Sequence, residues 1–210
     1  GGKPVLKNPL PPVYNIGKEE ISAVNKLLKK GPLSDFVGVK GKYFLGGRHV
    51  KRLELSFCKK FGVKYAVSFN SATTALHASI VALGIGPGDE VIVSPYTMAA
   101  SATAILMNGA VPVFADIDEK TFCIDPVSVR KCVTPRTKAI MAVNIFGGPS
   151  DFDELLKIAK EHDLKIIEDN AQGPGAKDKG RFAGTIGDIA IISFKVHKVI
   201  QSGESSGERV

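Results

Sequence analysis

The feature of this sequence that most constrains the fold is a regular alternation of short apolar runs with helical segments. The apolar runs are residues 65–69, 91–94, 111–115, 139–144, 165–168 and 189–193. The helical segments that separate most of them are residues 73–83, 98–108, 126–132 and 151–161. Strands that are apolar throughout are typical of a sheet buried on both faces, and intervening helices are typical of parallel strands. The pattern predicts an α/β domain with a largely parallel sheet.

An N-terminal region precedes this alternation. Residues 3–16 are rich in proline and glycine and predict an extended arm. Apolar residues recur at helical spacing in residues 18–30, which predicts a helix that Gly31-Pro32 would end. A second amphipathic helix is expected from about Val50 to Phe61, after an irregular, glycine-rich stretch.

Composition limits the class of protein. The sequence has no run of about 18 uncharged apolar residues, so no membrane-spanning helix is expected. The formal charge is +7, but lysine and arginine are scattered among acidic residues, which favours a solvated surface over a nucleic-acid-binding stripe. Cys58, Cys123 and Cys132 form no CxxC pair, which is typical of reduced thiols in a cytoplasmic protein. The four histidines lack metal-ligand spacing, so no metal site is expected.

Two glycine clusters superficially look like phosphate loops. Residues 84–88 follow a helix and precede a strand, the reverse of the order in a dinucleotide-binding loop, so we interpret them as a helix end and a turn. Residues 147–150 follow a strand and precede a helix that Ser150 is expected to cap. The carboxylates of Asp151 and Asp153 would repel a phosphate there, so we interpret this cluster as a loop.

Residues 70–76, Asn-Ser-Ala-Thr-Thr-Ala-Leu, are a better candidate for phosphate binding. They follow an expected strand and open an expected helix. Small side chains allow the backbone to approach a ligand, and a helix N-terminus offers free N–H groups and a favourable dipole. An ordinary Ser/Thr helix cap has the same pattern, and taken alone the segment favours that interpretation.

Two further segments carry residues suited to cofactor chemistry. Residues 167–172, Ile-Glu-Asp-Asn-Ala-Gln, end a strand in a carboxylate, where open α/β sheets bind ligands. A carboxylate there can keep the ring nitrogen of pyridoxal phosphate protonated, and the glutamine could donate to a ring oxygen. Residues 193–198, Ser-Phe-Lys-Val-His-Lys, follow the last strand, and a lysine there could form an imine with an aldehyde. A solvated acidic loop and a basic surface loop are the simpler alternatives.

In their order and spacing, these motifs resemble the DegT/DnrJ/EryC1/StrS family of sugar aminotransferases, which are fold-type-I enzymes dependent on pyridoxal phosphate. The resemblance extends from about Gly31 to Glu204. The matching segments are residues 69–76, 82–91, 112–118, 167–172, 187–188, 193–194, 197–198 and 203–204.

The resemblance implies a three-layer large domain with a mostly parallel sheet, and the family's C-terminal small domain is absent from this sequence. We therefore expect an N-terminal arm and helix (residues 1–30), a partial cofactor-binding domain (31–204) and a tail (205–210) whose origin the sequence leaves open.

The resemblance also implies a role for each matching residue. Lys198 would form the imine with pyridoxal 5′-phosphate and afterwards carry a proton. Its spacing of five residues from Ser193 favours it over Lys195. Asp169 would pair with the pyridine nitrogen, and Gln172 would reach the phenolic oxygen of the ring.

The remaining contacts concern the phosphate and the ring face. Thr73, Thr74 and Ser193 would hold the phosphate. Met98 stands where the family usually has an aromatic residue stacked on the ring, and its polarizable thioether can also cover a ring face. Asn170 stands where alanine or cysteine is common in the family.

The function implied is a cytoplasmic, homodimeric aminotransferase of polysaccharide biosynthesis. It would move an amino group from an amino acid such as glutamate to a nucleotide-linked keto sugar, without nucleic-acid or membrane partners. Related sugar dehydratases have histidine in place of the lysine, so Lys198 argues against that branch. Because the sequence stops shortly after Lys198, a truncated fragment that folds or associates without turnover is the alternative.

Overall fold

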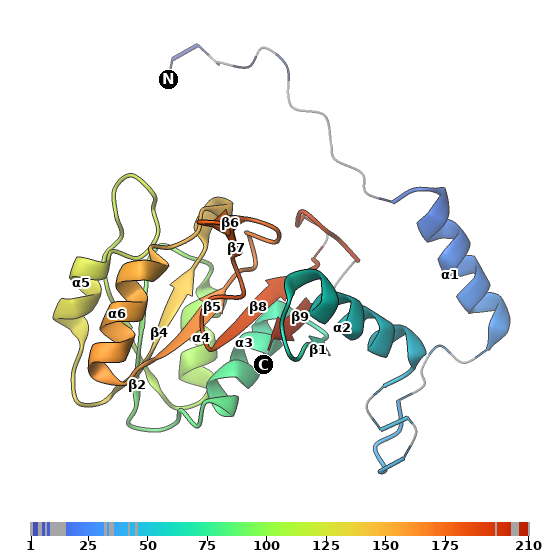
Figure 1. Ribbon diagram of the computed structural model, residues 1–210, viewed down its shortest axis with the longest axis horizontal. Coiled ribbons are helices and arrows are strands. Elements are labelled where there is room, and N and C mark those ends of the chain that lie inside the picture. The colour runs from blue at the N-terminus through green and yellow to red at the C-terminus, as the bar shows by residue number, and fades with distance from the viewer. Residues whose placement is uncertain are drawn as a thin grey trace. The chain divides into compact units, whose positions relative to one another are not determined.

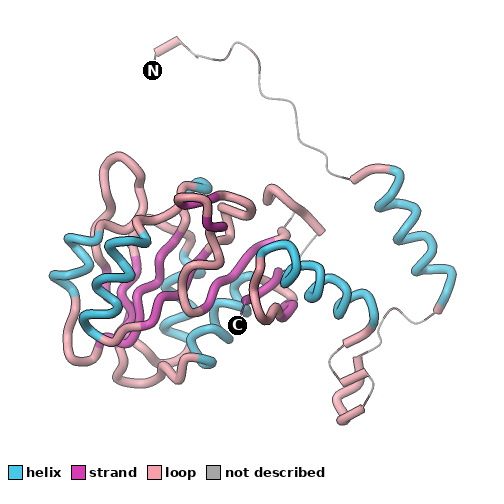
Figure 2. Tube along the Cα trace, viewed as in Figure 1, coloured by secondary structure: helices cyan, strands magenta, loops and turns pink. Residues whose placement is uncertain are grey.

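The computed structural model (Figures 1 and 2) describes residues 2–3, 6, 8, 16–31, 33, 36–41, 43–44, 46–195, 197–202 and 206–209. The chain separates into two compact units, Gly1–Gly47 and Arg48–Val210. The first unit contains helix α1 (Lys18–Lys30), which agrees with the predicted helix. This division falls after Gly47, and the predicted bounds at residues 30 and 204 stay a prediction.

The second unit is built on one main sheet. Its described strands are, in spatial order, β1 (Val67–Phe69), β9 (Ser206–Arg209), β8 (Ile189–Ser193), β5 (Lys165–Asp169), β4 (Thr137–Val143), β2 (Glu90–Val93) and β3 (Val111–Phe114). Strands β3, β2, β4, β5 and β8 are parallel, whereas β9 is antiparallel to both of its neighbours. The prediction of an α/β domain with a mostly parallel sheet is confirmed.

Helices cover both faces of this sheet (Figure 1). Helices α3 (Ala72–Ala82) and α4 (Ala99–Met107) pack on one face, and α5 (Pro126–Cys132) and α6 (Phe152–His162) pack on the other. Helix α2 (Arg48–Phe61) contacts β1. None of the described helices is both long and apolar enough to cross a lipid bilayer.

Side chains alternate between the two faces along the central strands, because successive residues of a strand point to opposite sides. In β2, Val91 and Val93 pack with α3 and α4, whereas Ile92 packs with α5 and α6. In β5, Ile167 and Ile166 divide in the same way. All five are fully buried, and burying such a side chain contributes about 1.5–3 kcal/mol. The sheet is therefore fixed between two apolar cores.

The predicted helices and strands agree with the structure to within two residues at each end. A two-stranded antiparallel sheet, β6 (Lys177–Asp178) with β7 (Arg181–Phe182), and the 3-10 turn η1 (Ile145–Gly147) were not predicted. Strand β9 was not predicted either, since it lies in the expected tail. Residues 84–88 form the expected helix end and turn, in which Gly84 and Gly88 have φ values of 72° and 90°.

Candidate active site

The candidate residues gather at the carboxyl-terminal edge of the parallel strands. Strand β2 lies between β3 and β4, so the chain reverses its direction across the sheet there. Such a switch point leaves a crevice in which open α/β sheets bind ligands. The loops that follow β2, β4, β5 and β8 carry Met98, Phe146, Gln172 and Lys198. Residues far apart in the sequence therefore lie at the same carboxyl-terminal edge of the sheet.

Strand geometry places Asp169 and Ser193 on the same face of the sheet. Asp169 lies two residues after Ile167, and Ser193 lies two residues after Ile191. Both isoleucines belong to the core shared with α3 and α4. Side chains two residues apart point to the same face, so Asp169 and Ser193 also face these helices. Both are buried, with exposed fractions of 5% and 3%.

Both oxygens of the Asp169 carboxylate accept hydrogen bonds. Oδ2 accepts from the hydroxyl of Ser101 in α4 at 2.8 Å, and Oδ1 accepts from the backbone N–H of Ala171 at 3.2 Å. Burial raises the pKa of Asp169, whereas these two hydrogen bonds and the positive charge of Lys198 act to lower it. The charge of Lys198 is the smallest of these influences, and the pairing of this lysine and acid around one ligand stays a prediction.

Lys198 is half-buried in a turn that follows β8. Its backbone N–H donates to the carbonyl of Lys195 at 2.8 Å, and the N–H of Ser202 donates to the carbonyl of Phe194 at 2.9 Å. The side chain of Lys195 is exposed. Residues 203–205 of the lysine loop, including the Gly203-Glu204 part of the resemblance, lie outside the described residues.

The loop after β4 orients the side-chain amide of Gln172. Its Oε1 accepts the backbone N–H of Phe146 at 2.8 Å. A backbone N–H can only donate, so the amide must present its oxygen to Phe146 and its Nε2 elsewhere. Gly147 has a φ of 84°, and a Cβ there would lie 3.2 Å from the carbonyl oxygen of Gln172. Glycine at position 147 therefore lets the two loops approach closely. The orientation of the Gln172 amide leaves its Nε2 to donate to another group.

Two buried amides tie the ends of β4 and β5 together. Asn144 Nδ2 donates to Asn170 Oδ1 at 3.0 Å, and Asn170 Nδ2 donates to the carbonyl of Ala183 at 2.9 Å. Asn144 Oδ1 accepts the backbone N–H of Ser150 at 3.0 Å. Asn170, which departs from the common family residue, is therefore accommodated by a matching amide directly after the adjacent strand.

The candidate phosphate cradle begins α3. Ser71 caps this helix, since its Oγ accepts the backbone N–H of Thr74 at 3.1 Å. The hydroxyl of Thr74 donates to Asn70 Oδ1 at 2.6 Å, and Thr73 and Thr74 are both exposed. Helix α3 packs against β8, which ends at Ser193. The segment thus forms the ordinary helix cap that the sequence left open, and its phosphate role stays a prediction.

An exposed aromatic cluster lies beside these loops and was missed by the sequence analysis. The rings of Tyr96, Phe122 and Phe146 have centroids 5.7–6.3 Å apart. Phe122 and Phe146 have φ values of 61° and 54°, which bulky residues rarely adopt. Met98, the residue at the N-cap of α4, is 66% exposed. The sequence signal that could have revealed this cluster is that its three rings lie in the segments that follow β2, β3 and β4.

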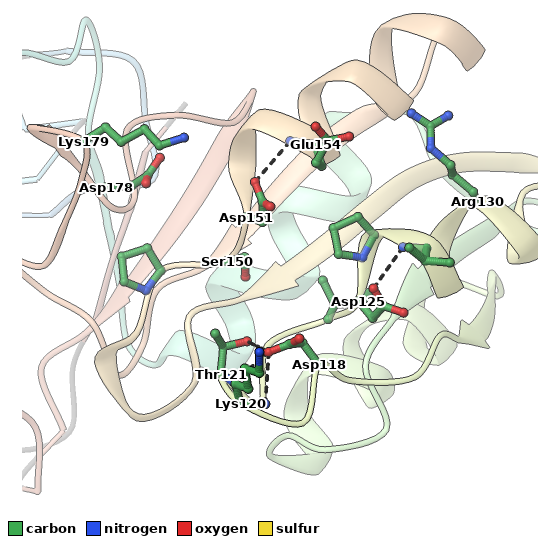
Figure 3. Close-up of a pocket in the computed structure, with 14 residues that line it drawn as sticks. Asp118, Lys120, Thr121, Asp125, Arg130, Ser150, Asp151, Glu154, Asp178 and Lys179 are labelled. Carbon is green, nitrogen blue, oxygen red and sulfur yellow. Dashed lines mark hydrogen bonds between the residues drawn. The ribbon is translucent and has the colours of Figure 1, made fainter.

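A separate pocket of about 710 Å³ lies at the N-terminal ends of α5 and α6 (Figure 3). None of its lining residues is one of the predicted cofactor-binding residues. Asp125 accepts the N–H groups of Val127 and Ser128, and Asp151 accepts that of Glu154, so these two carboxylates cap the helices. The pocket's acidic character therefore has a structural explanation.

The cap of α6 differs from the sequence expectation. Asp151 is the N-cap residue, so the prediction of Ser150 was wrong. Ser150 is buried, and its hydroxyl donates to the carbonyl of Val143 at 3.2 Å. That tertiary contact removes the hydroxyl from the helix end.

Comparison with known proteins identifies the family. The sequence profile of the DegT/DnrJ/EryC1/StrS aminotransferase family matches residues 15–206. GDP-perosamine synthase from Caulobacter vibrioides is 46% identical over 158 residues, which make up 75% of this chain and 43% of that protein. The chain spans about half the length of the curated relatives it matches.

Solved structures share the fold. An aminotransferase from Psychrobacter cryohalolentis is 35% identical with a TM-score of 0.86, covering 96% of this chain and 49% of that chain. The PLP form of a putative sugar aminotransferase from Streptococcus pneumoniae is 30% identical with a TM-score of 0.82, covering 93% and 51%. The family profile covers most of the sequence, and the chain belongs to the DegT/DnrJ/EryC1/StrS aminotransferase family.

Proposed function

We propose that this chain is the cofactor-binding part of an aminotransferase that uses pyridoxal 5′-phosphate. It would transfer an amino group from an amino acid such as glutamate to a nucleotide-linked keto sugar. The observation that carries the proposal is the buried carboxylate of Asp169 at a strand end, on which the charge of Lys198 acts. The names of the perosamine synthase and the PLP-form relative support the same chemistry.

The donor and acceptor groups of the site fit this cofactor. Its pyridine nitrogen needs a carboxylate, its phenolic oxygen a donor, and its aldehyde an amine. Asp169, Gln172 and Lys198 supply these three groups. The phosphate needs N–H and hydroxyl donors, which the start of α3, with Thr73 and Thr74, and Ser193 of β8 would supply.

Each of these side chains would have a defined role in the reaction. When bound, the cofactor supplies a protonated ring that withdraws electrons from the bond being broken. Asp169 holds that proton on the ring nitrogen, and a buried carboxylate gains from the cationic partner. Lys198 Nζ would bind the aldehyde carbon and, once the substrate amine has displaced it, would carry a proton to or from the substrate carbon. Met98 would cover one face of the ring.

The proposal extends to the setting of the protein. The thiols of Cys58, Cys123 and Cys132 are free, as is typical of a reducing compartment, which supports a cytoplasmic enzyme. Assembly as a homodimer rests on the family resemblance.

The first experiment tests attachment of the cofactor. The chain is mixed with pyridoxal 5′-phosphate, reduced with borohydride and digested, and the modified peptide is identified by mass spectrometry. We expect the label on Lys198, a visible absorbance band in the parent and in Lys195→Ala, and loss of both label and band in Lys198→Ala. Label on Lys195, or on no single lysine, would overturn the assignment.

Turnover is measured separately, because attachment alone is not amino transfer. The loaded protein is incubated with ¹⁵N-glutamate and a nucleotide-linked keto sugar, and the ¹⁵N content of the sugar is measured. The proposal predicts a labelled amino sugar. A chain that binds the cofactor but transfers no nitrogen would support the silent-fragment alternative.

A further inference from the structure

A chain of side-chain hydrogen bonds runs from the loop after β2 to Asp169. The hydroxyl of Thr97 lies 2.9 Å from that of Ser101, which lies 2.8 Å from Asp169 Oδ2. Ser101 is fully buried in the first turn of α4, and it stands 68 residues before Asp169 in the sequence. The contact therefore joins α4 to the end of β5 inside the protein.

The direction of the protons in this chain follows from the chemistry of its members. An ionised carboxylate can only accept, so Ser101 must use its single O–H to donate to Asp169. The hydroxyl of Ser101 then has only acceptor capacity left for Thr97, so Thr97 donates to Ser101. Both hydrogen bonds are therefore donated toward the carboxylate. Successive hydrogen bonds of this kind polarise and strengthen one another in a low-dielectric interior.

The charge state of Asp169 depends on opposing influences. Burial raises the pKa of this carboxyl, and the hydrogen bond from Ser101 is the largest influence that lowers it. The N–H of Ala171 and the charge of Lys198 contribute in the same direction. A protonated Asp169 could not hold a proton on the nitrogen of a bound pyridine.

Other titratable groups do not replace Ser101 in this role. Of the two helices on this face, α4 carries no titratable side chain and α3 carries one, His77. Lys138 of β4 is exposed near the start of its strand, whereas Asp169 lies at the end of β5. Glu168 points to the opposite face, where it accepts backbone N–H groups of the loop before β8.

We propose that Ser101, assisted by Thr97, is a positioning residue that keeps Asp169 ionised and oriented for the pyridine nitrogen. This inference rests on the proposed function. Ser101 does not itself touch the cofactor, and it acts through Asp169. The hydroxyl is required, so threonine can replace serine and alanine cannot.

The first test needs no cofactor. In the full chain labelled with ¹³C at aspartate carboxyls, Asp169→Asn identifies the Asp169 signal, whose pH titration is then followed by NMR. Ser101→Ala is expected to move its midpoint to higher pH, Ser101→Thr to leave it near that of the parent, and Thr97→Val to give an intermediate midpoint. Ser79→Ala, which removes another fully buried serine hydroxyl, should leave it unchanged.

Two outcomes would overturn the inference. One is a folded Ser101→Ala protein in which Asp169 titrates as in the parent. If Ser101→Ala does not fold, Thr97→Val decides the question, because it keeps the direct partner of Asp169 and removes only the outer donor. An Asp169 titration midpoint that is unchanged in Thr97→Val would then refute the proposed role of the Thr97–Ser101 hydrogen bonds.

The second test measures cofactor affinity. A hydrogen bond to a charged group changes binding substantially, so Ser101→Ala should bind pyridoxal 5′-phosphate about tenfold more weakly near neutral pH. The ratio to the parent should approach unity at high pH, where Asp169 is ionised in both proteins. A ratio independent of pH would indicate a merely structural effect. If the parent binds no cofactor, the proposed function fails while the NMR titration still tests Ser101.

Discussion

The carboxylate of Glu168 accepts three backbone N–H groups from a single loop. Oε2 accepts from Gly184, and Oε1 accepts from Ile186 and Gly187, each at 2.6 Å. The side chain is fully buried on the face opposite to that of Asp169. Because this loop leads directly into β8, Glu168 helps to fix the strand that precedes Lys198.

Replacing Glu168 tests this tether. Glu168→Gln exchanges one accepting oxygen for an amide that can only donate, so at least one buried N–H loses its acceptor. We expect the free energy of unfolding to fall by about 1–3 kcal/mol in urea titrations. The matched control Glu161→Gln removes an exposed ion pair with Arg130 and should cost clearly less than Glu168→Gln, because solvent screens exposed ion pairs. Equal losses in both variants would refute the tether.

At the residue scale, the sequence indicated candidate side chains near strand ends. It did not indicate side chains whose role depends on contacts that form only in the folded chain. The acid could be proposed because Asp169 ends an apolar run, and the lysine because Lys198 lies five residues after Ser193, as in the family that the sequence resembles. Ser101 has no such signal, since its importance depends on a contact with Asp169 across 68 residues. The same reason hid the pairing of Asn170 with Asn144, because the sequence does not state which strands are neighbours.

The packing of β8 against β5 requires a glycine, Gly187, just before β8 begins. A Cβ on Gly187 would lie 2.8 Å from both Cγ2 and the carbonyl oxygen of Ile166 in β5. Gly187 needs no unusual φ, so its requirement is one of space. Gly86, in contrast, has open space around the same position.

These two glycines give a matched pair of substitutions. Gly187→Ala is expected to lower the free energy of unfolding by about 1–3 kcal/mol, because a strand backbone must shift. Gly86→Ala should be neutral or stabilise the protein by up to about 1 kcal/mol, since it restricts the unfolded chain without a clash. Chemical denaturation of both variants measures the difference. A Gly187→Ala protein as stable as Gly86→Ala would contradict the packing argument.

The start of β2 is tied to the loop before β4 by Glu90. Its carboxylate is almost fully buried and accepts from the hydroxyl of Thr134 at 2.5 Å and from Nε of Arg136 at 2.8 Å. The hydrogen bond from Thr134, followed by that from Arg136, lowers the pKa of Glu90. The stabilisation is therefore complete above the ordinary glutamate pKa of about 4.3 and is lost as the pH falls through the lowered value.

Glu90→Gln tests this dependence. At pH 7 its melting temperature should lie a few degrees below that of the parent, because the ionic acceptor is lost. The difference should shrink as the pH is lowered through the pKa of Glu90, where the parent loses the same interaction. Glu119→Gln, at an exposed position, serves as the control and should follow the parent at every pH. A difference that does not depend on pH would refute the ionic contribution.

At the element scale, helices and central strands were predictable because burial on one or two faces leaves a periodic apolar pattern. Strands β6 and β7 are two residues long and mostly polar, so they leave no such pattern. Strand β9, Ser-Gly-Glu-Arg, has little intrinsic preference for a strand and owes its conformation to the backbone partners on either side.

For the whole molecule, cofactor binding should appear as added stability. A ligand that binds only the folded protein raises the free energy of unfolding by about 2.7 kcal/mol at 100 times its Kd. We expect pyridoxal 5′-phosphate to stabilise the parent more than Lys198→Ala, which lacks the covalent bond. Deoxypyridoxine phosphate, which has no aldehyde, should stabilise both proteins alike. Equal stabilisation of both proteins by pyridoxal 5′-phosphate would argue against attachment at Lys198.

The position of β9 between β8 and β1 constrains the order in which the chain can fold. Among the described strands, synthesis produces β1 first and its partner β9 after all of the parallel strands, so β1 has no partner on that side while the parallel strands assemble. During that interval, both β1 and β8 offer free backbone edges that can recruit other nascent chains. Vulnerability to aggregation should therefore peak just before Ser206 leaves the exit tunnel and fall once β9 closes the gap.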